Sequence, residues 1–278
     1  MEFTLLTILI LIGVAATCEF IDSSMGMMYG TILTPVLVIS GFEPLIVVPS
    51  VLLSQAVGGL MASVLHHRLK NADLKLKIQQ PKTIINNIKR VGYIEALRSI
   101  LGKDARASFC IAILGVIATV LAVLLAVNIP KVALKTYIGA LVLMMGVLLF
   151  SQFKFKYTWK KILWVGILSA FNKGLSGGGF GPVTTSGQMI AGKDGKSSIG
   201  ATTLAEVPIC LTGFVVYLFT RGLANWFLLS CLVAGATIGA LIGPHFTARF
   251  KDDKKLRKIL AIIVIVLGVW TLTKTWLI

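Results

Sequence analysis

Seven long apolar runs constrain the fold of this chain more than any other feature of its sequence. Each has about 17–25 residues, the length that an α-helix needs to cross the hydrocarbon core of a bilayer. The runs are Phe3–Ile21, Leu45–Leu65, Ser108–Val127, Val132–Ser151, Ser197–Phe219, Trp226–Ile242 and Ile259–Ile278. Charged residues make up 14% of the chain, against about 25% in an ordinary soluble domain. The sequence therefore predicts an all-α polytopic membrane protein that lies in a lipid bilayer and keeps its first run as a helix.

The basic residues indicate how the chain is oriented. Of the 27 Lys and Arg residues, 22 fall in four segments. These are Arg68–Arg106, Lys154–Lys161, the pair Lys193 and Lys196, and Arg249–Lys258. Because basic segments collect on the cytoplasmic side, all four are predicted to face the cytoplasm, including the long loop 66–106, whose charge suits anionic lipid headgroups. The placement of the basic residues therefore explains the net charge of +16 as a basic cytoplasmic rim on a multi-pass membrane protein, and no nucleic-acid partner is expected.

An internal repeat divides the chain into two halves. A shift of 151 residues places "FIDSSMGMMYG" on "FNKGLSGGGFG". The identical pairs are Val14/Val165, Phe20/Phe171, Gly26/Gly177, Gly30/Gly181, Thr34/Thr185, Ile39/Ile190, Gly41/Gly192 and Leu53/Leu204. The predicted transmembrane repeats are 1–152, which includes the basic loop, and 153–278, with five helical segments each. An odd number of segments gives the halves opposite orientations, with the N- and C-termini outside. Such inverted-topology repeats are typical of secondary transporters.

Each half opens with two short apolar segments that meet at a polar break. The breaks, Phe20–Gly30 and Phe171–Gly181, predict broken or re-entrant helices at the repeat interface, because irregular backbone at membrane depth must be covered by protein or water. Their glycines would expose amides at a helix N-terminus, where the helix dipole and Lys173 favour an anion. The alternative is that the glycines only allow close helix packing. The predicted substrate-binding residues are Asp22, Ser23, Ser24, Gly26, Asn172, Lys173, Ser176, Gly177, Gly178, Gly179, Gly181 and Glu206.

Ionisable residues inside the apolar segments are the main functional candidates. Asp22 and Lys173 occupy the same position of the repeat, and charges within a membrane usually mark functional sites. A structural salt bridge between these two residues is the alternative. Glu206, whose repeat partner is Gln55, precedes Pro208, which predicts an interruption of its helix. Glu206 is expected either to contact the substrate and carry a coupling proton, or to anchor unwound backbone.

Other residue patterns give weaker signals. Glu19, one helical turn before Asp22, ranks below the other acidic candidates. The four cysteines are isolated, and no His/Glu pattern has metal-ligand spacing, so neither a metal nor another cofactor is expected. No nucleophile–base spacing favours an intramembrane enzyme.

Three segments carry a resemblance to a known family. "DSSMGMMYGTILTP" and "NKGLSGGGFGPVTTSGQ", followed by "GATTLAEVP", resemble the two repeat motifs of the sulfite exporter TauE/SafE family. The first motif departs from the pattern, because Met27 and Met28 stand where many members have a glycine triplet. The resemblance implies a plasma-membrane carrier for small sulfur-containing or organic anions, such as sulfite or sulfonates.

The sequence and the resemblance together predict a secondary transporter of a small anion. The expected substrate is sulfite, a sulfonate or a related sulfur-containing anion, moved by alternating access with proton coupling as an option. No ATP-binding motif is present in the sequence, so an ion or substrate gradient would supply the energy. The alternatives are an anion channel of the same architecture, a transporter of another small carboxylate-type anion, and a membrane scaffold. The oligomeric state is left open.

Overall fold

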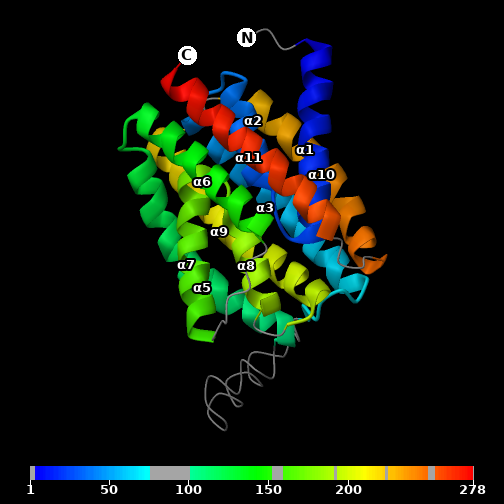
Figure 1. The fold of residues 1–278 in the computed structure, drawn as a ribbon. Helices are drawn as coiled ribbons and strands as arrows, with labels where there is room; N and C mark the ends of the chain where they lie inside the picture. The colour runs from blue at the N-terminus through cyan, green and yellow to red at the C-terminus, as the bar shows by residue number, and fades with distance from the viewer. Residues whose placement is uncertain are drawn as a thin grey trace.

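The computed structural model describes residues 4–75, 101–151, 159–190, 193–222, 225–249 and 254–277. Most of the predicted basic loop therefore lies outside the described residues. The helices are α1 (Leu5–Met25), α2 (Tyr29–Ile39), α3 (Pro44–Arg68), α5 (Lys103–Ala126), α6 (Lys131–Ser151), α7 (Trp159–Ser176), α8 (Phe180–Ile190), α9 (Gly195–Arg221), α10 (Trp226–Arg249) and α11 (Lys254–Trp276). Their order along the chain is shown by the colours of Figure 1.

Six of these helices are long and apolar enough to cross a membrane, namely α1, α3, α5, α6, α9 and α10. The short helix α2 and residues Ala261–Trp276 of α11 are apolar as well. Large apolar side chains such as Ile117 and Leu121 on α5 are exposed, which suits contact with lipid chains. The prediction of an all-α polytopic membrane protein is therefore confirmed.

The helices pack in a reciprocal pattern when they are counted within the two predicted repeats. The first helix of each repeat packs on the fourth helix of the other, as α1 does on α10 and α7 on α5. The third helix of each repeat also contacts the fourth helix of the other, in the pairs α3–α10 and α9–α5. The third helices, α3 and α9, contact each other, and so do the fifth helices, α6 and α11. Exchanging the two repeats turns α1–α10 into α7–α5 and α3–α10 into α9–α5, and it leaves α3–α9 and α6–α11 unchanged.

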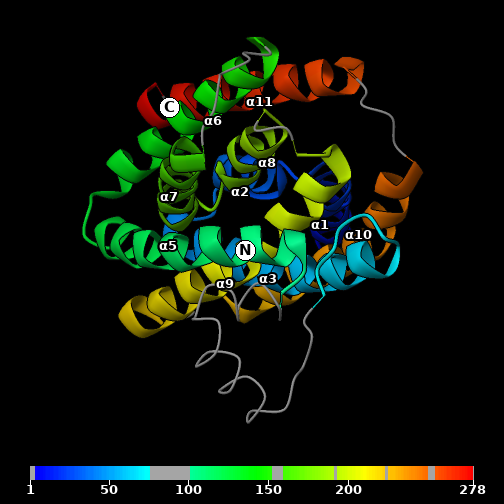
Figure 2. The same cartoon turned by 90° about the horizontal axis from the view of Figure 1, so that it is seen from below.

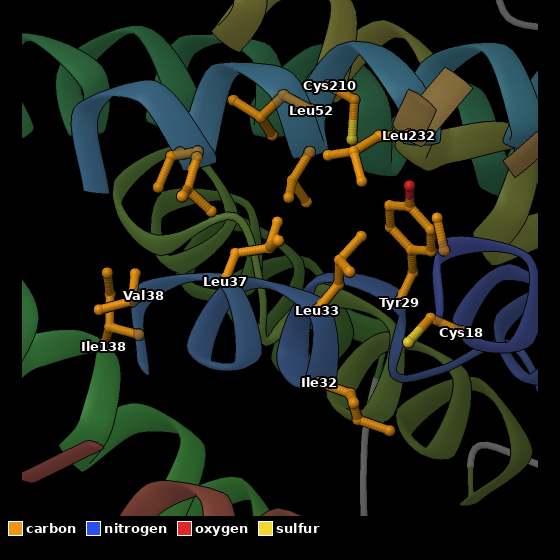
Figure 3. Close-up of a cluster of buried hydrophobic side chains, with 14 of the residues drawn as sticks. Cys18, Tyr29, Ile32, Leu33, Leu37, Val38, Leu52, Ile138, Cys210 and Leu232 are labelled. Carbon is orange, nitrogen blue, oxygen red and sulfur yellow. The ribbon is translucent and has the colours of Figure 1, made fainter. Parts of the chain in front are cut away.

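The short helices α2 and α8 lie inside the bundle, with the longer helices around them (Figure 2). Helix α2 is held there by a cluster of apolar side chains in which Leu33 and Leu37 face Leu52 of α3 (Figure 3). The Tyr29 hydroxyl is hydrogen-bonded to Ser54 Oγ of α3 at 2.7 Å. These contacts hold the start of α2 inside the bundle, and the first polar break, which comes just before α2, is held there with it.

Both predicted breaks are helix interruptions with the same backbone conformation. Gly26 has φ 72° and Gly177 has φ 75°, and the two are repeat partners. Two residues further on, Met28 has φ 102° and Gly179 has φ 83°. A positive φ favours glycine, because the Cβ atom of other residues is crowded by the following carbonyl group. Met28 is therefore strained where the second repeat has glycine.

The predicted interruption at Pro208 is wrong. Helix α9 runs without a break from Gly195 to Arg221 with Pro208 inside it. A proline removes one main-chain hydrogen bond, and packing on neighbouring helices often tolerates this loss within a membrane. Here α9 is packed against α3 and α5, so the helix continues past the proline.

Candidate anion-binding site

A chain of four buried polar side chains crosses the centre of the bundle. They are Asp22 on α1, Gln55 on α3, Lys173 on α7 and Glu206 on α9, each at most 4% exposed. Gln55 Nε2 donates a hydrogen bond of 3.1 Å to Asp22 Oδ2, and Lys173 Nζ donates to Gln55 Oε1. Lys173 Nζ also forms an ion pair of 2.8 Å with Glu206 Oε1. We call these residues the central polar chain.

The central polar chain is built from two equivalent pairs. Asp22 and Lys173 are repeat partners, and so are Gln55 and Glu206. The pair within the first repeat is Asp22–Gln55, the pair within the second is Lys173–Glu206, and the contact from Gln55 to Lys173 joins them. The site therefore lies where the two predicted repeats meet, with opposite charges at equivalent positions.

Gln55 lies between Asp22 and Lys173, which the sequence analysis gives as a possible structural salt bridge. Asp22 accepts hydrogen bonds from Gln55 Nε2 and from the Tyr29 main-chain N–H, at 3.1 and 3.0 Å. The ion-pair partner of Lys173 is Glu206 instead. Removing one member of a buried ion pair costs about 3–5 kcal/mol, because the other charge is left without a partner. Lys173 and Glu206 therefore depend on each other in this conformation.

The amides of the second break have side-chain partners in this conformation. The Gly178 N–H donates to Ser176 Oγ at 3.2 Å, and the Gly179 N–H donates to Thr31 Oγ1 of the first repeat at 3.1 Å. Ser176 Oγ in turn donates to the Asn172 carbonyl oxygen at 2.7 Å. An anion at these amides would therefore replace hydroxyl groups, which are neutral acceptors of similar size to an oxyanion oxygen.

The two breaks touch each other through their glycines. A Cβ atom on Gly30 would overlap the Gly177 carbonyl oxygen, and one on Gly181 would lie 2.6 Å from the Gly26 carbonyl oxygen. Since Gly30 and Gly181 are repeat partners, as are Gly26 and Gly177, the contact is reciprocal. Close packing of the two breaks is thus one role of these glycines, and this is the alternative to anion binding that the sequence analysis gives.

Three of the remaining predicted residues, Ser23, Ser24 and Asn172, form hydrogen bonds with groups outside the central polar chain. Ser23 Oγ donates to the Glu19 carbonyl oxygen at 2.6 Å, and Ser24 Oγ donates to the Ile21 carbonyl oxygen at 3.2 Å. Asn172 Oδ1 accepts a hydrogen bond from the Tyr137 hydroxyl. The structure therefore brings Asp22, Lys173 and Glu206 into one site, whereas the hydroxyl groups of Ser23 and Ser24 bond to main-chain carbonyl oxygens.

Sequence reasoning missed Gln55 as a site residue, although its signal was present. Gln55 aligns with Glu206 at the same shift that aligns Asp22 with Lys173. When two polar positions of an apolar chain recur at the same shift, the four side chains at these positions are expected to meet. Gln55 was left out of the candidate residues only because its side chain is uncharged.

A second ion pair lies near the ends of helices rather than at the centre. Lys193 Nζ, just before α9, lies 3.0 Å from Asp104 Oδ1 at the start of α5, and it donates to Gln188 Oε1 at 3.0 Å. Burial lowers the pKa of Lys193 below the usual lysine value, and the Asp104 carboxylate opposes this change. The pair connects the two predicted repeats at this end of the bundle.

Comparisons with known proteins agree with the sequence motifs. The profile of the family described as "Sulfite exporter TauE/SafE" matches residues 91–271. The chain is 24% identical over 275 residues to the "Probable membrane transporter protein YtnM" of Bacillus subtilis (strain 168), which covers 93% of this chain and 80% of that protein. No solved structure matches the chain. The family match spans both the second break and the Glu206 segment, which carry the motifs. The chain therefore belongs to the sulfite exporter TauE/SafE family of membrane transporters.

Proposed function

We propose that the protein is a secondary transporter of a small sulfur-containing anion, sulfite or a sulfonate, in the plasma membrane. The observation that carries this proposal is the buried Lys173, whose ammonium group meets Glu206 at the junction of the two predicted repeats. A lysine at this depth is expensive and marks a substrate or ion pathway in membrane proteins. The family match adds the chemical class of the substrate.

The ion pair suggests how the anion is recognised. A buried ammonium group needs an anionic partner in every state of the transport cycle, because leaving it unpaired is costly. In the present conformation Glu206 is that partner. We propose that the substrate competes with Glu206 for Lys173, and that the amides of Gly178 and Gly179 exchange Ser176 and Thr31 for the oxygen atoms of the substrate.

The arrangement of the helices supports alternating access between inverted repeats, 1–152 and 153–278. The main helix contacts of one repeat have counterparts in the other, as α1–α10 has in α7–α5 and α3–α10 has in α9–α5, which is expected for two units related by a pseudo-two-fold axis. The start of α1 and the end of α11 lie at one end of the bundle, and the start of α5 lies at the other (Figure 1). This agrees with termini outside and a cytoplasmic loop 66–106. The four side chains of the central polar chain are buried in this conformation, as an occluded state of the proposed cycle would require.

Transport by purified protein in liposomes tests this proposal. Wild-type protein should take up sulfite with saturable kinetics and should exchange internal for external sulfite, whereas a channel would show no stimulated exchange. The double variant Lys173→Gln/Glu206→Gln, which removes the ion pair without leaving a lone charge, should lose both activities. The matched control is Lys131→Gln/Glu43→Gln, which removes an exposed ion pair of 2.7 Å. Full sulfite exchange by the Lys173→Gln/Glu206→Gln variant would refute the proposed site.

A further inference from the structure

Glu19 on α1 is a fully buried carboxyl group without a hydrogen-bond partner. It is 0% exposed, and neither of its carboxyl oxygens is hydrogen-bonded to any described residue. Two glycines make room for the side chain. A Cβ atom on Gly58 of α3 would lie 2.9 Å from Glu19 Cδ, and one on Gly239 of α10 would lie 2.8 Å from Glu19 Cβ. The carboxyl group thus fills a tight space between α1, α3 and α10.

The second repeat fills the equivalent space with hydrocarbon. The shift of 151 residues pairs Glu19 with Ala170 and Gly58 with Ile209. Both of these residues contact Gly115 of α5, where an added Cβ atom would lie 2.6 Å from Ile209 Cδ1 and 3.1 Å from Ala170 Cβ. An alanine and an isoleucine therefore satisfy the packing of this interface, and packing alone gives no reason for a carboxyl group in the first repeat.

The hydrogen-bond partners separate Glu19 from the two other carboxyl groups near the centre. Asp22 has two N–H donors, and Glu206 has the ammonium group of Lys173. An ionised carboxylate without any partner in an apolar environment costs many kcal/mol, so such a group takes up a proton instead. The carboxyl group of Glu19 is therefore the one of the three that must be protonated in this conformation.

The surroundings of Glu19 also restrict the ligand that it can hold. Metal cations need several oxygen ligands, and the described residues contain no group of three His, Cys, Asp or Glu side chains that could hold a metal ion. Helices α3 and α10 face Glu19 with Gly58 and Gly239, and the Ala236 side chain of α10 lies next to Gly58. The titratable and charged groups around it are Cys18 and Asp22 on α1, Tyr29 on α2, Lys173 on α7, and Cys210 and Glu206 on α9. A proton is the ligand that fits.

We propose that Glu19 is a proton-binding site of the transporter and that it couples anion movement to a pH gradient. This inference rests on the proposed function and identifies its coupled ion. The carboxylate binds one proton to form a carboxylic acid, which is enclosed while α1 lies against α3 and α10. The proton is released to water when these helices separate in the transport cycle. The site is distinct from the Lys173–Glu206 pair, which holds the anion or its internal substitute.

The variant Glu19→Gln tests this proposal, because glutamine has nearly the shape of a protonated glutamate but cannot release a proton. In proteoliposomes, accumulation of sulfite driven by a pH gradient should fall to the level measured without a gradient, while sulfite exchange persists. The surface variant Glu43→Gln should keep both activities. Gradient-driven accumulation that is unchanged in Glu19→Gln, or that follows a Na⁺ gradient in the wild type, would overturn the proposal.

Infrared spectroscopy measures the protonation of Glu19 without any substrate. At neutral pH, the spectrum of wild-type protein minus that of Glu19→Gln should show the C=O stretch of a carboxylic acid. A carboxylate band in its place would overturn the proton site. If the wild type moves no sulfite at all, the proposed function fails and the coupling role falls with it, while this spectrum still decides whether Glu19 binds a proton.

A second variant separates the carboxyl group from its packing. Glu19→Ala/Gly58→Ile copies the residues of the second repeat, so it removes the carboxyl group and fills the space. It should behave as Glu19→Gln does, with sulfite exchange present and gradient-driven accumulation absent. If this variant accumulates sulfite in response to a pH gradient as the wild type does, Glu19 only fills space.

Discussion

Lys173 Nζ and Glu206 Oε1 lie 2.8 Å apart on two different helices, with 2% and 5% of their side chains exposed. Because neither charge has access to water, each stabilises the other and each is destabilising alone. The first prediction concerns this dependence. Lys173→Gln should lower the free energy of unfolding by about 3–5 kcal/mol, whereas Lys173→Gln/Glu206→Gln should recover most of this loss. Thermal unfolding of the detergent-purified variants checks the difference, and equal instability of the single and double variants would contradict it.

Glu206→Gln should raise the affinity for sulfite, because the internal competitor for Lys173 is removed. Hydrogen bonds to charged groups contribute about 1.5–3 kcal/mol, so the dissociation constant should fall about tenfold or more. Isothermal titration or sulfite-dependent thermal protection measures this change. Unchanged or weaker binding would mean that Glu206 does not compete with the substrate.

The same variant separates the two carboxyl groups as proton sites. Sulfite uptake should still be stimulated by a pH gradient in Glu206→Gln, although at a lower rate because Lys173 has no internal partner in the empty carrier, and the stimulation should be lost in Glu19→Gln. The reverse result would assign the coupling proton to Glu206, which is the option that the sequence alone favours.

Gly30→Ala should destabilise the protein strongly, because the added methyl group would overlap the main chain of Gly177. Overpacking in a dense interior typically costs about 1–3 kcal/mol, and main-chain atoms cannot change rotamer to relieve it. Gly187→Ala is the control, since a Cβ atom there meets nothing within 4 Å. Equal melting temperatures for the two variants would show that the breaks do not touch as described.

The orientation of the chain is tested by cysteine labelling in intact cells with an impermeant thiol reagent. In a cysteine-free background, Ser40→Cys, between α2 and α3, should be labelled from outside. Lys103→Cys, at the start of α5, should be labelled only after the cells are permeabilised. Both positions are exposed, so access to the reagent depends on the side of the membrane. Labelling of Lys103→Cys alone in intact cells would reverse the proposed topology.

Much of the fold could be predicted from the sequence, because lipid leaves few alternatives to an apolar helix. The sequence also predicts the positions of the two breaks, because glycines that recur at the same shift are rare within apolar segments. The conformation of Met28 could not be predicted, because its φ of 102° opposes the local preference of methionine. Met28 is buried in the apolar core, and packing between distant segments is absent from any local sequence pattern.

The candidate site was predictable in part. Asp22, Lys173 and Glu206 stood out because a charge in an apolar segment is rare. The sequence could not predict which of Glu19 and Glu206 is the better candidate for a proton site, since this depends on which carboxyl group has a cation beside it. The ion pair of Glu206 and the unpartnered oxygens of Glu19 become evident only when α1, α7 and α9 are placed in space.

The reciprocal contact between the two breaks limits how the repeats can move. Gly30 lies against the Gly177 carbonyl group and Gly181 against that of Gly26, so sliding one repeat past the other would drive main-chain atoms into each other. Rotation about the contact avoids this collision. In the proposed alternating-access cycle, the two breaks would then act as a pivot, and the helices would separate toward either end of the bundle. The path of the substrate would therefore run beside the glycines rather than between them.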